Sequence, residues 1–129
     1  MPRHTFKKNE RLTGKKTFDL LFTSGQSISV FPFRLVWMQN TRHSTTPLQL
    51  GISVPKRLFD RAVDRNKIKR RMREAYRKNK QLVYEVPKKK HPSIALMMIY
   101  TAKDVLSYQE IEKKMIVSLQ KLAPLVAGK

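Results

Sequence analysis

Apolar residues at spacings of three and four predict three helices along the chain. The first begins at Thr13 or Gly14 and ends near Thr23. The second spans Ala62–Tyr84, and the third follows a cap at Asp104 or Ser107. The residues predicted to face the core are Ile68, Met72, Ala75 and Tyr76 on the second helix, and Ile111, Met115, Ile116, Leu119 and Leu122 on the third.

Three segments rich in branched and aromatic residues predict strands. Ile28–Gln39 alternates between apolar and polar residues, and its Pro32 marks a bulge, a break or an edge. Leu48–Val54 is expected to pair antiparallel with it, as in a hairpin, whereas Ser93–Thr101 is almost continuously apolar and predicts a buried strand. The order α-β-β-α-β-α predicts an α+β two-layer sandwich, in which helices pack on one small, mostly antiparallel sheet.

Length and composition narrow the possible classes of protein. The chain has 129 residues, which fits a single domain, and residues 1–10 are expected to form a flexible basic arm. It has no cysteine, so a disulfide scaffold, a cysteine-ligated metal centre and a thiol nucleophile are excluded. No apolar run approaches the roughly 20 residues of a membrane-spanning helix. The three histidines do not stand at metal-ligand spacing, so no protein metal site is expected.

Positive charge dominates the sequence and gathers along the second predicted helix. The formal net charge is +19, and 15 of the 28 Lys and Arg residues lie between residues 56 and 90. A row of cations at steps of four lies beside the core stripe of this helix; it consists of Arg65, Lys69, Arg73 and Arg77. Arg70 and Lys80 lie on the same flank of the helix. Because like charges at this spacing destabilise an isolated helix, we expect a polyanion to lie along the row, with a solvated face as the alternative.

Two polar residues of this helix differ in how far the spacing defines their roles. Asn66 can bond to the backbone near the first turn or contact RNA. Glu74 is expected to pair within the helix. Nucleic acid is the expected polyanion, and an acidic membrane surface is the lesser alternative.

The residues of this helix also resemble a known signature. Residues 62–74 read Ala-Val-Asp-Arg-Asn-Lys-Ile-Lys-Arg-Arg-Met-Arg-Glu, which is similar to the signature of the bacterial ribonuclease P protein component. The preceding Gly51–Arg57 resembles that family's strand ending in a Lys-Lys pair. Arg11, Leu12, Phe18 and Phe22 resemble its N-terminal helix, so the resemblance covers about residues 9–122.

The resemblance implies a function that the charge could not specify. It implies the protein subunit of ribonuclease P, a tRNA-processing endonuclease and hydrolase that removes the 5′ leader of precursor tRNA. In that family the RNA subunit performs catalysis with bound Mg²⁺, so no catalytic residue and no cofactor is expected on the protein alone. The implied partners are the ribonuclease P RNA, with one protein per RNA, and precursor tRNA. A cytoplasmic location without membrane contact is expected.

The resemblance also assigns residues and a topology. The implied RNA-binding set is Lys56, Arg57, Arg65, Asn66, Lys69, Arg70 and Arg73, with Arg11 and Arg77 as additional basic residues. Phe18, Phe22 and Phe33 are implied to line a cleft for the single-stranded leader, although the spacing of Phe18 and Phe22 also fits core packing. The implied fold is like domain two of ribosomal protein S-five, with a left-handed β-α-β crossover.

Two features depart from the family pattern, and two other functions stay open. Leu58–Arg61 stands where many members have a glycine. Val36 stands where a strand aromatic is expected, and the adjacent Trp37 faces the other side of a regular strand. The chain could instead be a structural, ribosomal-type RNA-binding protein with no processing role. A DNA-binding regulator would need a helix-turn-helix and a dimer surface, and neither is apparent.

Overall fold

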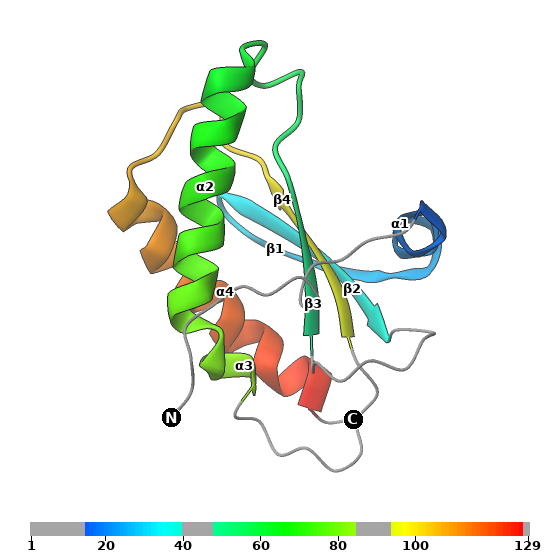
Figure 1. Ribbon diagram of the computed structural model, residues 1–129. Coiled ribbons are helices and arrows are strands. Elements are labelled where there is room, and N and C mark those ends of the chain that lie inside the picture. The colour runs from blue at the N-terminus through cyan, green and yellow to red at the C-terminus, as the bar shows by residue number, and fades with distance from the viewer. Residues whose placement is uncertain (1–14, 40–47, 85–93, 128–129) are drawn as a thin grey trace.

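The computed structural model describes residues 15–39, 48–84 and 94–127 of the chain (Figure 1). These residues form four helices and four strands. In chain order the elements are α1 (Lys15–Ser24), β1 (Gln26–Val30), β2 (Phe33–Gln39), β3 (Leu48–Ser53), α2 (Ala62–Asn79), α3 (Gln81–Tyr84), β4 (Ile94–Tyr100) and α4 (Tyr108–Ala127). The arm predicted for residues 1–10 and the basic residue Arg11 lie outside the described residues.

The four strands form one sheet in the order β1-β2-β4-β3. The β1–β2 and β2–β4 pairs are antiparallel, and the β3–β4 pair is parallel. The parallel pair is connected through α2 and α3, which makes the β-α-β crossover that the resemblance implied. The predicted α+β class and the mostly antiparallel sheet are therefore confirmed, and the left-handed sense of the crossover stays a prediction.

The first predicted strand is in fact two strands. The segment 26–39 forms the antiparallel pair β1 and β2, which meet at a turn containing the cis Phe31-Pro32 peptide bond. Proline lacks the N–H that a continuous strand would use in its ladder, so the chain turns there. The carbonyl oxygen of Pro32 accepts a hydrogen bond from the Thr101 N–H at 2.8 Å. The prediction of a break at Pro32 is confirmed, and the prediction of a single strand is wrong.

The expected hairpin between this segment and Leu48–Ser53 is also wrong. β2 is paired with β1 along one edge and with β4 along the other, so no edge of β2 remains for β3. β3 lies instead at the edge of the sheet, parallel to β4, with Leu50 opposite Leu96. The apolar β4 takes a central place because both of its faces are covered by other residues.

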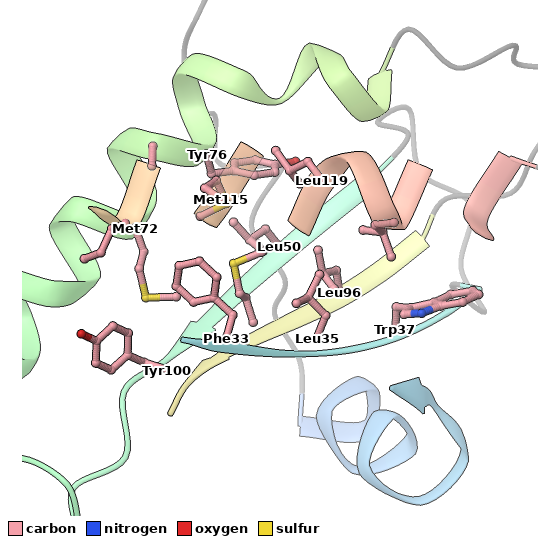
Figure 2. Close-up of a cluster of buried hydrophobic side chains, with 14 of the residues drawn as sticks. Phe33, Leu35, Trp37, Leu50, Met72, Tyr76, Leu96, Tyr100, Met115 and Leu119 are labelled. Atoms are coloured by element: carbon pink, nitrogen blue, oxygen red, sulfur yellow. The ribbon is translucent and has the colours of Figure 1, made fainter. Parts of the chain in front are cut away.

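The larger core lies between the sheet and helices α2 and α4 (Figure 2). All four residues predicted for the inner stripe of α2 are fully buried. On α4, four of the five predicted residues are fully buried and Ile116 is partly buried. A smaller cluster lies on the opposite face of the sheet, beneath α1; it consists of Leu21, Val36, Ala95 and Met97.

The last helix begins with a reciprocal pair of hydrogen bonds between Ser107 and Glu110. The Glu110 N–H donates to Ser107 Oγ at 3.2 Å, and the Ser107 N–H donates to Glu110 Oε1 at 3.2 Å. This is a capping box, which satisfies two backbone donors that the first turn leaves free. Of the two caps considered from the sequence, Ser107 is the one that forms. The carbonyl of Asp104 accepts a hydrogen bond from the Tyr100 hydroxyl instead.

Candidate nucleic-acid interface

Helix α2 has one face in the core and an opposite face in solvent. At about 100° per residue, the predicted RNA-contacting residues turn away from the stripe that contains Ile68 and Met72. We call the group Asn66, Lys69, Arg70 and Arg73 the outer face of α2. Asn66, Arg70 and Arg73 are exposed, and Lys69 is half-buried. Within the described ranges, none of the four makes an ion pair or a side-chain hydrogen bond, so the positive charges of Lys69, Arg70 and Arg73 are uncompensated.

Arg65 holds the loop that precedes α2. Its Nη1 donates to the carbonyl oxygens of Phe59 at 2.7 Å and Asp60 at 2.8 Å. The loop turns inward at Phe59, whose buried ring lies 5.9 Å from that of Tyr100. The loop without the family's glycine is therefore shaped by a buried aromatic and an arginine clamp. Arg65 positions this loop as well as contributing charge.

Two exposed cations, Lys56 and Arg57, lie at the start of the same loop. The Leu58 N–H donates to the Pro55 carbonyl oxygen at 3.1 Å, which closes a turn around them. Four residues, Leu58–Arg61, separate the pair from the start of α2. The predicted basic pair thus lies shortly before the N-terminal half of α2, where the outer face begins at Asn66.

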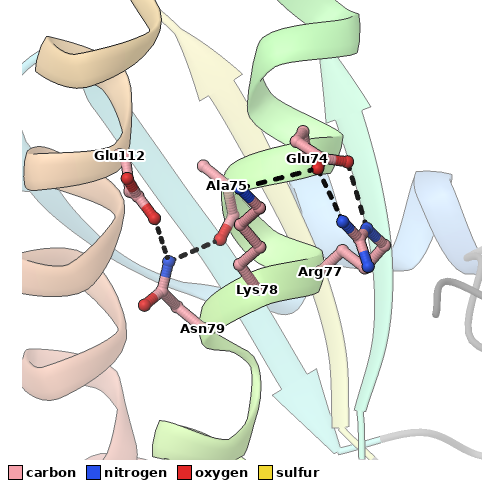
Figure 3. A network of polar contacts seen from close by, with 6 residues as sticks. All are labelled: Glu74, Ala75, Arg77, Lys78, Asn79 and Glu112. Carbon is pink, nitrogen blue, oxygen red and sulfur yellow. Dashed lines mark hydrogen bonds and ion pairs between the residues drawn. The ribbon is translucent and has the colours of Figure 1, made fainter. Parts of the chain in front are cut away.

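Arg77 differs from the rest of the predicted row because a carboxylate pairs with it (Figure 3). Its Nε donates to Glu74 Oε1 at 3.0 Å and its Nη2 donates to Glu74 Oε2 at 2.6 Å. The hydrogen bond from Arg77 lowers the pKa of Glu74, and the same bond raises the pKa of Arg77. Lys78 lies 3.9 Å from the same carboxylate. The intrahelical pairing predicted for Glu74 is confirmed, and Arg77 is not an uncompensated cation as its place in the row suggested.

Lys80 also departs from its expected place on the basic flank. It is only 8% exposed and lies between α2 and α3, where the predicted long helix breaks. The continuous row predicted from spacing therefore reduces to the outer face of α2, with Arg65 and Arg77 engaged by the protein itself.

Two polar contacts that the sequence analysis missed fix α2 against the C-terminal part of the chain. Arg71 Nη1 donates to the carbonyl oxygen of Leu106 at 2.6 Å. Asn79 Nδ2 donates to the Ala75 carbonyl oxygen at 2.8 Å and to Glu112 Oε2 at 3.1 Å (Figure 3). These contacts join elements far apart in sequence, so no local pattern could have indicated them. They hold the outer face of α2 in a fixed orientation.

The three phenylalanines predicted for the leader cleft have different environments. Phe33 is 1% exposed and packs edge-on against Tyr100, with ring centroids 6.4 Å apart (Figure 2). A ring without accessible surface cannot stack on a base, so we exclude Phe33 from the candidate site. Phe22 is 60% exposed on α1, and the side chain of Phe18 lies outside the described residues.

The face of the sheet beneath α1 is covered over only part of its area. Gly25 ends α1, and its N–H donates to the Leu21 carbonyl oxygen at 2.9 Å. A Cβ at Gly25 would lie 2.5 Å from that oxygen and 3.0 Å from Val36 Cγ1, so only glycine permits this approach. The strand residues beyond Val36 include exposed side chains, among them Arg34. We call this side of the sheet the open face, and the side under α2 and α4 the closed face.

Two exposed residues of the β1–β2 hairpin were not among the site residues predicted from the sequence. Phe31 is 65% exposed at the turn, and Arg34 is exposed on the open face. Strand alternation from the buried Phe33 could have placed Arg34 on the opposite side from the core.

The described residues provide no evidence for a metal site or a membrane span. Within residues 15–39, 48–84 and 94–127, no three acidic, histidine or cysteine residues gather to ligate a metal ion. In the same ranges, no helix combines the length and the apolar character needed to cross a bilayer.

An uncompensated cationic helix face on a small α+β domain is typical of proteins that bind nucleic acid. The sequence of this chain matches the family model described as Ribonuclease P over residues 6–123. The chain therefore belongs to the ribonuclease P protein family.

Curated relatives and solved structures agree with this assignment. The chain is 30% identical over 122 residues to the ribonuclease P protein component of Porphyromonas gingivalis, covering 95% of this chain and 89% of the relative. It is similar to the ribonuclease P protein of Staphylococcus aureus, with a TM-score of 0.69, 26% identity, and coverage of 92% and 98% of the two chains. It is also similar to that of Thermotoga maritima, with a TM-score of 0.68, 26% identity, and coverage of 87% and 96%.

Proposed function

We propose that this chain is the protein subunit of ribonuclease P, which binds the catalytic RNA and the 5′ leader of precursor tRNA. In this role it promotes endonucleolytic removal of the leader. The observation that carries the proposal is the outer face of α2, an uncompensated and oriented cationic surface within the family signature. Family membership supplies the RNA partner, and the chemistry of this surface suits an RNA backbone.

The outer face of α2 fits a folded RNA in both size and chemistry. Asn66 and Arg73 are seven residues apart, so the face extends over about 10 Å along the helix. Guanidinium groups hold phosphates with two parallel hydrogen bonds, and an amide side chain such as that of Asn66 can bond to a 2′-hydroxyl or a base edge. Because Arg71 and Asn79 fix the helix, these groups are oriented before the RNA arrives.

We further propose that the RNA subunit performs the chemistry. Phosphodiester hydrolysis needs groups that activate water and stabilise the leaving oxygen, and the Mg²⁺ ions that do this would be held by RNA phosphates. The protein would contribute binding and orientation, with one protein per RNA, in the cytoplasm.

The open face of the sheet is the part of the protein that we assign to the leader. Single-stranded RNA is bound by stacking bases on aromatic rings while cations follow the backbone. Phe22 offers an exposed ring on α1, and Arg34 offers a cation on the sheet. The aromatic and the cation thus lie on the same side of the protein, opposite α2 and α4.

Reconstitution tests the proposal directly. The protein is mixed with bacterial ribonuclease P RNA and a precursor tRNA at a Mg²⁺ concentration too low for efficient cleavage by the RNA alone. We expect the protein to increase leader removal. If cleavage does not change although the protein binds the RNA, the structural RNA-binding alternative is favoured.

A matched pair of double variants tests the role of the outer face. Arg70→Ala/Arg73→Ala removes two charges from α2, and Lys113→Ala/Lys114→Ala removes two exposed charges from α4. We expect only the α2 variant to bind ribonuclease P RNA weakly, with the salt dependence reduced by roughly one unit of log K against log salt per lost phosphate contact. Equal losses in both variants would mean that the RNA responds only to net charge, and would contradict the assignment of α2.

A further inference from the structure

One row of residues crosses the open face at the end nearest the β1–β2 hairpin turn. Arg34 lies opposite Ser29 on β1 and opposite Ile99 on β4, and Ile99 lies opposite Ser53 on β3. Residues directly opposite one another point to the same face of a sheet, so this row crosses all four strands on the open face. With about 4.8 Å between strands, it spans roughly 14 Å.

The alternation of β2 fixes the face to which Arg34 belongs. Phe33 and Leu35 are buried in the closed-face core, and Val36 belongs to the cluster under α1. Arg34 therefore shares the face of Val36, two residues nearer the hairpin turn. The next row along the open face is covered by α1, because Val36 and Met97 are buried beneath Leu21 of that helix. Helix α1 thus covers the Val36 row and leaves the Arg34 row uncovered.

The side chains of the uncovered row differ from those of a core. Arg34 and Ser29 are exposed, and Ile99 and Ser53 are half-buried. Over the described ranges, Arg34 forms no ion pair and no side-chain hydrogen bond. Arg34 thus has a hydroxyl residue, Ser29, on one side and an apolar residue, Ile99, on the other. A guanidinium in this setting, with no carboxylate partner, is a suitable arrangement for a phosphate group next to a sugar or base.

We propose that Arg34, with Ser29 beside it, forms a phosphate clamp that holds one backbone phosphate of the single-stranded leader on the open face. This inference rests on the proposed function and adds to it a residue that distinguishes precursor tRNA from mature tRNA. Because the guanidinium recognises a phosphate and no base, the leader nucleotide held at this row is bound independently of its identity. Base stacking on the exposed aromatic ring of α1 is a separate contact.

Binding measurements with three proteins test the clamp. Wild type, Arg34→Ala and the control Lys113→Ala are assembled with ribonuclease P RNA, and each complex is titrated with precursor tRNA and with mature tRNA. Arg34 is exposed, so R34A is expected to keep the thermal midpoint of wild type. We expect R34A to weaken binding of the precursor about tenfold, the usual order for a charge-assisted hydrogen bond, with mature tRNA nearly unchanged. K113A is expected to bind both RNAs like wild type.

Chemically altered leaders separate phosphate recognition from base recognition. A series of precursors carries one uncharged methylphosphonate linkage at successive leader positions, and a second series carries one abasic nucleotide. Wild type is expected to lose affinity at one methylphosphonate position, and R34A to be insensitive at that position. If R34A responds to every altered phosphate as wild type does, or if only abasic positions distinguish the two proteins, the phosphate clamp is wrong.

The outcomes also separate this inference from the proposed function. If wild type prefers the precursor over mature tRNA and R34A has the same preference, the clamp is wrong and the function stands. If wild type does not distinguish the two RNAs at all, the proposed leader contact itself is wrong. Arg34→Lys sharpens the result, because a lysine keeps the charge without the planar fork and is expected to recover only part of the lost affinity.

Discussion

The two faces of the sheet are built from alternate residues of the same strands, yet they have different uses. The closed face carries a large apolar core under two long helices. Among the described residues, the open face has a smaller cluster of four buried residues under the short helix α1, and next to it a row with an exposed arginine. Burying apolar area stabilises the fold, whereas exposed cations and rings weaken it or leave it unchanged. Stability is therefore concentrated on the closed face, which leaves the open face available for contacts with a partner.

Adjacent methionines on β4 test this division most strongly. Met98 is fully buried on the closed face, and Met97 is buried in the smaller cluster on the open face. We expect Met98→Ala to lower the free energy of unfolding by about 4 kcal/mol and Met97→Ala by about 2 kcal/mol, because the open face can relax around the cavity. Urea unfolding of the two variants measures the difference. Equal losses would show that the two faces are packed alike.

The docking of α1 on the open face depends on Gly25. A methyl group there would collide with the Leu21 carbonyl oxygen and Val36. Gly25→Ala is therefore expected to weaken the docking of α1 on the sheet by about 1–3 kcal/mol. The adjacent exposed Ser24→Ala serves as the control and is expected to change little. Hydrogen exchange in the G25A variant should increase in α1 and remain unchanged in α2. Increased exchange throughout both helices would mean that the open face is not an independent layer.

The buried hydroxyl of Tyr100 on the closed face is expected to make a smaller contribution to the free energy of unfolding, and this contribution depends on pH. The Tyr100 hydroxyl donates to the Asp104 carbonyl oxygen at 2.6 Å and accepts from the Leu106 N–H at 3.2 Å. Tyr100→Phe removes both bonds, and we expect a loss of about 1–2 kcal/mol in urea unfolding.

The pH dependence of this loss follows from the ionisation of the tyrosine. Burial raises the pKa of Tyr100 in the folded protein. The folded state therefore favours the neutral hydroxyl, and its contribution is complete below the ordinary tyrosine pKa and is lost as the pH rises through the folded value. Wild type should lose more stability than Y100F between about pH 8 and about pH 11. A difference between the two proteins that is constant over this range would contradict the burial of the hydroxyl.

The sequence predicted local periodicity well and non-local pairing poorly. The inner residues of α2 and α4 follow from helical spacing because each stripe must face the core wherever the sheet lies. The sheet order does not follow, since the place of β3 depends on β1 occupying the other edge of β2. Strand alternation separates Phe33 from Arg34, but it does not indicate which side the helices cover. Phe33 was assigned to the site by the resemblance alone, and Arg34 was not among the residues that the resemblance assigned.

The cationic row shows the same limit on the surface. Spacing identified the cations of the outer face, and the pairing of Glu74 with Arg77 could be predicted because the two residues are one turn apart. The use of Arg65 could not be predicted, because its partners are backbone carbonyls whose positions depend on the packing of Phe59. The resemblance indicated the family. The structure shows which basic residues of α2 are not engaged by other groups of the protein.

The smallest effect on stability is expected at Phe22, next to the buried Leu21 on α1. Phe22 is 60% exposed, so Phe22→Ala should change the free energy of unfolding by no more than about 0.5 kcal/mol. If the ring stacks on a leader base, the same variant should weaken binding of precursor tRNA by about 1–3 kcal/mol and leave mature tRNA unaffected. Leu20→Ala, an exposed apolar residue on the same helix, controls for loss of apolar area without stacking. A large loss of stability in F22A would place Phe22 with the core, and the open face would then bind the leader through its cations alone.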